Sequence, residues 1–113
     1  MNKKTVIVAG KKLEIQKNQT VKSVAASRKR ARATVDLGNG FERFEFTRVV
    51  PANTIFRFTF IAGSRKTISA GWSNVRGLPY TVLSFPQGNN WVVIVNNGLN
   101  TSLTTTFAFI TKL

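Results

Sequence analysis

The chain has 113 residues, enough for one compact core, and carries 17 Lys and Arg against four Asp and Glu, a formal net charge of +13. It contains no Cys and no His, which excludes disulfides, thiolate nucleophiles, Cys/His zinc sites and acid–base catalysis by histidine. The four acids are too scattered to predict a metal site or a paired-carboxylate active site, so we expect neither enzyme activity nor a cofactor: Glu14, Asp36, Glu42 and Glu45.

The net charge predicts a polyanionic partner, because a small domain this basic repels itself unless an anion neutralises it. Nucleic acid, an acidic membrane surface and an acidic protein all meet that requirement, and charge alone does not choose among them. Residues 1–33 hold ten basic residues and one acidic residue, whereas residues 34–113 hold seven and three. We therefore expect the anion to bind the first third of the chain.

The first ten residues, MNKKTVIVAG, start like a signal peptide, but their apolar stretch spans about five residues where about 7–15 are needed. No apolar run approaches the roughly 20 residues of a membrane-spanning helix. The sequence thus predicts synthesis in a cytoplasm, no secretion by a signal peptide and no membrane-spanning segment.

Residues 1–33 are predicted to form a basic arm, a short β-hairpin followed by one helix. Residues 5–9 and 12–15 are β-prone runs on either side of Gly10, a residue suited to a tight turn. Thr20 can cap a helix whose early apolar positions, Val21, Val24 and Ala25, share one face. The last two turns of this helix would be basic nearly all round. The candidate polyanion-binding residues are Lys22, Arg28, Lys29, Arg30 and Arg32.

Residues 34–113 are predicted to form an antiparallel β-domain. The stretches FERFEFTRVV and TIFRFTFIAG alternate with period two, and further strands are expected at residues 67–70, 81–85, 91–95 and 101–111. Six short strands separated by turn residues indicate a small antiparallel β-sandwich or open barrel. Asn97-Gly98 predicts a hairpin between the last two strands.

Phenylalanine accounts for nine of the 113 residues, and alternating aromatic residues on strands usually face the core. The alternative is an exposed stacking platform for single-stranded nucleic acid, for which Phe56-Arg57-Phe58 has a suitable composition. We favour the core interpretation for seven of these residues: Phe44, Phe46, Phe56, Phe58, Phe60, Phe107 and Phe109.

Residues 77–111 form a run of 35 residues with no charged side chain. Their polar positions are Thr, Ser, Asn and Gln, which do not guard a strand against pairing with another molecule as charges do. A polar, Thr-rich sheet face is one explanation, and a surface covered by a neighbouring subunit is the other. Thr104 and Thr106 are the candidate subunit-interface residues, and the sequence leaves open which of them faces outward.

The basic segment SRKRAR together with the uncharged stretch GNNWVVIVNNGLNTSLTTTFAFITKL resembles, in layout, the small structural proteins of virions. The resemblance implies a non-enzymatic capsid or capsid-associated subunit of a virus or phage. Its β-domain would contact copies of itself or other shell subunits, and its basic segment would face nucleic acid or another polyanion. Two alternatives are a stand-alone nucleic-acid-binding protein and a carbohydrate-binding or adhesion domain that uses Trp72, Tyr80 and Trp91.

Overall fold

The computed structural model describes the backbone of residues 4–8, 11–15, 19–74 and 82–113, and the side chains of residues 19–74 and 82–113. Nearly all of the regular structure is β. The strands are β1 (Lys4–Val8), β2 (Lys11–Ile15), β3 (Thr20–Ser27), β4 (Ala33–Gly38), β5 (Phe41–Val50), β6 (Thr54–Ile61), β7 (Lys66–Asn74), β8 (Val82–Gln87), β9 (Asn90–Asn97) and β10 (Leu103–Lys112). Within the described residues, no helix has the length and apolar character needed to cross a membrane.

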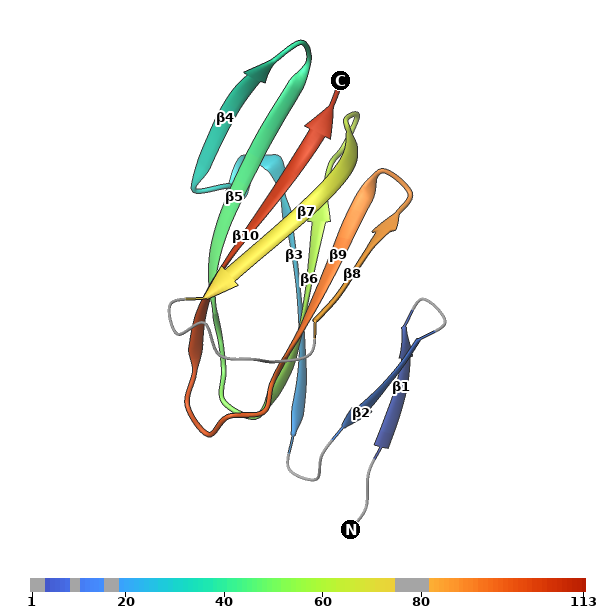
Figure 1. The fold of residues 1–113 in the computed structure, drawn as a ribbon, viewed down its shortest axis with the longest axis vertical. Coiled ribbons are helices and arrows are strands. Elements are labelled where there is room, and N and C mark those ends of the chain that lie inside the picture. Colours follow the sequence, from blue (N-terminus) through green and yellow to red (C-terminus); the bar gives the residue numbers. More distant parts are fainter. Residues whose placement is uncertain (1–3, 9–10, 16–18, 75–81) are drawn as a thin grey trace.

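Two four-stranded sheets pack face to face as a β-sandwich (Figure 1). Sheet I has the strand order β4-β5-β10-β7, and sheet II has the order β3-β6-β9-β8. All neighbouring pairs are antiparallel except β3 and β6, which run parallel. The predicted mainly β sandwich is therefore confirmed, with one parallel pair that the sequence did not indicate. Strands β1 and β2 form the predicted hairpin, whose turn lies outside the described residues.

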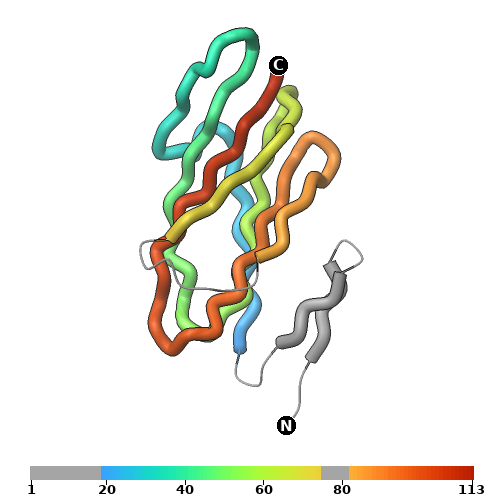
Figure 2. Tube along the Cα trace, in the orientation of Figure 1, coloured from blue at the N-terminus to red at the C-terminus, as the bar shows by residue number. Residues whose placement is uncertain are grey.

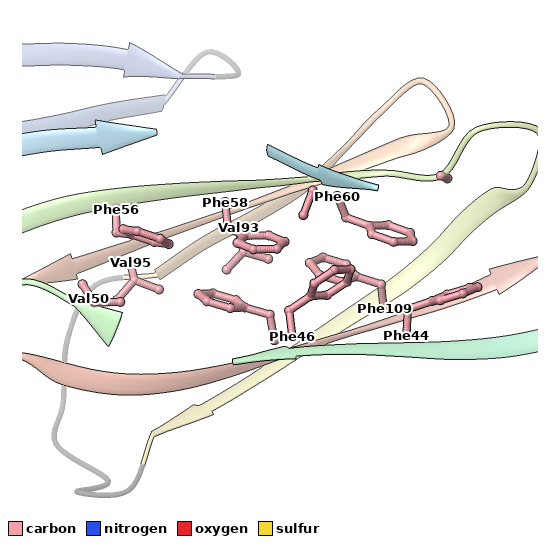
Figure 3. Packing of buried hydrophobic residues seen from close by; sticks show 12 residues of the cluster. Phe44, Phe46, Val50, Phe56, Phe58, Phe60, Val93, Val95 and Phe109 are labelled. Atoms are coloured by element: carbon pink, nitrogen blue, oxygen red, sulfur yellow. The ribbon is translucent and has the colours of Figure 1, made fainter. Parts of the chain in front are cut away.

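The core consists of phenylalanine rings that the two sheets direct toward each other (Figure 3). The ring of Phe58 from sheet II stacks on Phe107 from sheet I with 4.8 Å between centroids. Phe60 stacks on Phe109 in the same way at 4.7 Å. All seven predicted core phenylalanines are buried, which contradicts their use as an exposed stacking platform. Because side chains alternate between the two faces of a strand, residues spaced two apart, such as these phenylalanines, lie on the same face.

The predicted basic helix is wrong. Residues 20–27 form strand β3, which pairs with β6 from Thr20 opposite Thr54 to Ser27 opposite Ile61. Pairing satisfies one backbone edge of β6 and buries Ala26 among the phenylalanines, with Val24 packed beside it. These long-range gains outweigh the local helix signals, because helix propensity differs by less than about 1 kcal/mol between ordinary residues. After β3, Arg28–Arg30 form one 3₁₀ turn, η1.

The predicted last hairpin is also wrong, because β9 and β10 belong to different sheets. Asn97 is fully buried instead, and its Nδ2 donates to the carbonyls of Val50, Pro51 and Thr101 at 3.3, 3.0 and 3.0 Å. Its Oδ1 accepts a hydrogen bond from the Leu99 amide at 3.0 Å. This side chain ties the β5–β6 turn to the β9–β10 connection at one end of the sandwich.

The other predicted strands correspond to β5 to β10, and the sequence analysis missed β4. Sheet II is apolar on both faces, since a second buried cluster of Ile55, Val92 and Ile94 lies at positions that alternate with the phenylalanine core. Residues 91–95 are apolar without interruption, as expected for a strand buried on both faces.

Candidate polyanion-binding site

The basic turn η1 connects sheet II to sheet I, because β3 ends at Ser27 and β4 begins at Ala33 (Figure 2). The backbone is extended at Ser27 and again at Ala31, so the 3₁₀ turn is confined to three residues. The Ala31 amide donates to the Arg28 carbonyl at 3.2 Å, and the Arg32 amide donates to the Glu45 carbonyl at 2.8 Å. A 3₁₀ turn has about three residues per turn, so Arg28, Lys29 and Arg30 point in three different directions around it.

Arg28 lies over the turn between β6 and β7. A Cβ built on Gly63 would lie 3.2 Å from its Nη2, and Gly63 itself has a φ of +66°, which favours glycine. A shallow cleft of about 560 Å³ opens here, lined by Ser27, Arg28, Lys29, Ile61 and Gly63. The cleft therefore has two cationic side chains on one wall, and Ile61 and Gly63 on the other.

Eleven Lys and Arg side chains fall within the described residues, and five of them have partners. Arg32 and Arg43 pair with Glu45, and Arg65 pairs with Glu42. Arg48 donates to the Thr47 carbonyl and Lys112 to the Asn39 carbonyl, and both cations lie over phenyl rings. Six have no ion-pair or hydrogen-bond partner in this part of the chain: Lys22, Arg28, Lys29, Arg30, Arg57 and Lys66. Three of these six make up the whole of η1.

The structure separates the other two candidate residues from this turn. Lys22 lies on β3, six residues before Arg28, which corresponds to about 20 Å along an extended strand. Arg32 lies beyond the turn, and its Nη2 is 3.3 Å from Glu45 Oε1. Of the five predicted polyanion-binding residues, only Arg28, Lys29 and Arg30 lie together without a carboxylate.

Thr104 and Thr106 occupy outward positions of β10, because Leu103, Thr105 and Phe107 between and beside them are buried. Thr106 Oγ1 lies 3.4 Å from the hydroxyl of Thr47 on β5. The residues directly opposite them on the neighbouring strands are uncharged: Val49 and Thr47 on β5, and Ser73 opposite Thr106 on β7. Both threonines therefore face the same way, which answers the question of orientation that the sequence left open.

Of the aromatic residues considered for sugar binding, the two that the structure describes, Trp72 and Trp91, lie on different sheets and do not form a common platform. Trp91 is partly buried, and its Nε1 donates to Ser84 Oγ at 2.7 Å. Trp72 is 39% exposed and lies on the other sheet, opposite Phe107. Tyr80 lies outside the described residues.

Sequence reasoning missed the end of β6 and the turn after it, which supply Ile61 and Gly63 to the cleft. The motif AGSRK at residues 62–66 was the available signal, since it joins a turn glycine to two cations. Arg65 in this motif is not available to a ligand, because it is buried and bonds Glu42 Oε1 at 2.9 Å, Thr111 Oγ1 at 2.7 Å and the Gly40 carbonyl at 2.6 Å. Lys66 is exposed. No group of three His, Cys, Asp or Glu in the described ranges could hold a metal ion.

A family model named YjdH matches residues 22–111. The chain belongs to the YjdH family. The match runs from the third residue of β3 to the penultimate residue of β10, so the YjdH region includes the sandwich and the basic turn but not the β1–β2 hairpin. No curated protein and no solved structure gave a match.

Proposed function

We propose that this YjdH-family chain is a non-enzymatic structural subunit of a viral or phage particle, and that it binds the phosphate backbone of nucleic acid through η1. The observation that carries the proposal is the turn Arg28–Arg30, three successive cations with no carboxylate partner in the described residues, beside a cleft with a glycine wall. Unpaired cations with backbone nearby suit phosphate oxygens, which accept hydrogen bonds from Arg, Lys and backbone N–H groups.

The separation of charge supports a role in a shell. The unpaired cations of η1 lie at one connection between the sheets, whereas Thr104 and Thr106 on sheet I lie opposite the uncharged residues Val49 and Thr47. In a particle, the first surface would meet the genome and the second would meet neighbouring subunits. A phosphate contact of this kind reads no base sequence, because it touches no base edge.

The test is a salt titration of oligonucleotide binding. Replacing Arg28, Lys29 and Arg30 together by Gln should reduce the magnitude of the log–log salt slope on duplex DNA by about three, since each phosphate contact contributes about 0.9. The matched control replaces Arg43, Arg57 and Lys112 by Gln, which removes the same charge elsewhere and should change the slope by less than one contact. Affinity should be similar for oligonucleotides of unrelated sequence.

Two results would contradict the proposal. If wild-type protein binds no oligonucleotide at low salt, the turn serves an acidic protein or the fold itself. If the control triple variant flattens the slope as much as the η1 variant, binding follows net charge and has no site at the turn.

A further inference from the structure

A sandwich of two open sheets has four edge strands, and three of them here carry a residue that discourages pairing with another chain. Strand β3 carries Lys22, β4 carries Asp36 and β8 carries Pro86. Charges and prolines are the usual devices that keep the unpaired backbone of an edge strand from joining a second sheet. Strand β7 is the exception.

After its first residue, Lys66, strand β7 has no charged residue and no proline. A bulge at Ile68 interrupts the register with β10, and the Thr67 amide donates to the Asn89 carbonyl at 3.1 Å, so the regular edge begins at residue 69. Residues 69–74 read SAGWSN, and Gly71, Trp72 and Ser73 are exposed. This part of the edge therefore carries no charged side chain that would oppose a second strand.

From these features we propose that β7 is the surface by which the chain associates with a second copy of itself, through antiparallel pairing of residues 69–73 about a two-fold axis. We infer that the partner is a second copy of the chain because this edge is uncharged on an otherwise basic molecule. Each molecule carries +13, so two copies repel wherever basic surfaces meet, and the uncharged edge is a place where identical strands can pair without opposing like charges. An isologous contact of this kind is closed, because each edge is used once.

This pairing deepens the proposed role as a structural subunit by naming the contact between copies, and it does not depend on nucleic-acid binding. It would join two copies of sheet I into one continuous sheet of eight strands. Thr104 and Thr106 would then lie on the face of that sheet, one strand away from the new edge-to-edge contact.

The test is analytical ultracentrifugation without nucleic acid, at about 0.15 M salt and over about a hundredfold range of concentration. The Gly71→Lys variant places a charge at the middle of the edge without a clash, because nothing lies within 4 Å of a Cβ built there. We expect concentration-dependent dimers for wild type and a dissociation constant at least about tenfold higher for Gly71→Lys. Gly71→Gln has similar bulk without charge, and Asn100→Lys has the same charge at an exposed loop position, so both should dimerise like wild type.

Several outcomes would overturn the inference. They are a wild-type monomer at every concentration, equal weakening by Gly71→Lys and Asn100→Lys, or equal weakening by Gly71→Lys and Gly71→Gln. Stronger weakening by Thr106→Lys than by Gly71→Lys would place the contact on the sheet face instead. If Gly71→Lys does not fold by circular dichroism, Ser73→Lys tests the same edge. Dimerisation that persists while the η1 variant loses oligonucleotide binding would show that the two proposals stand separately.

Discussion

At the residue scale, the least expected feature is that two buried polar side chains each bind several groups from different parts of the chain. Asn97 bonds three carbonyls and one amide from a fully buried position, and Arg65 bonds a carboxylate, a hydroxyl and a carbonyl while almost wholly buried. Asn97 joins the β5–β6 turn to the β9–β10 connection, and Arg65 joins the β6–β7 turn to β5, β10 and the β4–β5 turn. Buried polar groups of this kind stabilise a fold mainly because leaving their partners unpaired is costly.

We predict that Asn97→Ala lowers the free energy of unfolding by roughly 2–3 kcal/mol, because the backbone groups of Val50, Pro51, Thr101 and Leu99 lose their partner. Urea denaturation followed by circular dichroism measures this change. The control is Asn100→Ala on the same connection, which is exposed and should change stability by less than about 0.5 kcal/mol. Equal effects of the two substitutions would mean that the Asn97 contacts contribute little.

At the element scale, strand β3 determines how the basic turn is presented. As a strand it ends at Ser27 on the edge of sheet II, and the chain must then cross to β4 in sheet I, which confines Arg28–Arg30 to one turn between the layers. The geometry of the site therefore depends on the pairing of β3 with β6.

Two neighbouring substitutions test this pairing. Ala25 is exposed on β3 opposite Thr59, so Ala25→Thr should leave stability unchanged or raise it by up to about 1 kcal/mol, whereas a helix would lose about 0.5 kcal/mol. Ala26 is packed in the phenylalanine cluster, so Ala26→Thr should lower stability by about 1–3 kcal/mol. Thermal and urea unfolding of both variants would give these values. A clear loss of stability in Ala25→Thr would contradict the strand assignment.

At the scale of the whole molecule, net charge makes the two proposed associations respond oppositely to salt. Self-association brings two +13 molecules together through an uncharged edge, so screening should favour it. Binding of nucleic acid releases counterions, so salt should oppose it. The direction of the salt dependence therefore distinguishes self-association from nucleic-acid binding.

We predict that raising salt from about 0.01 M to about 0.1 M, which shortens the screening length from about 30 Å to about 10 Å, strengthens dimerisation and weakens oligonucleotide binding. Sedimentation and fluorescence anisotropy on one series of buffers would measure the two constants side by side. If dimerisation also weakens with salt, ion pairs hold the copies together and the uncharged edge is not the contact.

The sequence by itself excluded disulfides, thiolate nucleophiles and acid–base catalysis by histidine, and it identified the phenylalanines that fill the core. The absence of His and Cys is a property of composition, and period-two alternation assigns each phenylalanine to a face without knowledge of its partner strand. It also located the run of basic residues from Arg28 to Arg32 and the uncharged stretch at residues 77–111. Only the tertiary structure decided that residues 20–27 pair with β6, that Asn97 bridges two connections and that Gly63 faces Arg28. These contacts join residues 34–47 positions apart, and local propensities carry no information about which distant edge or carbonyl a segment will meet.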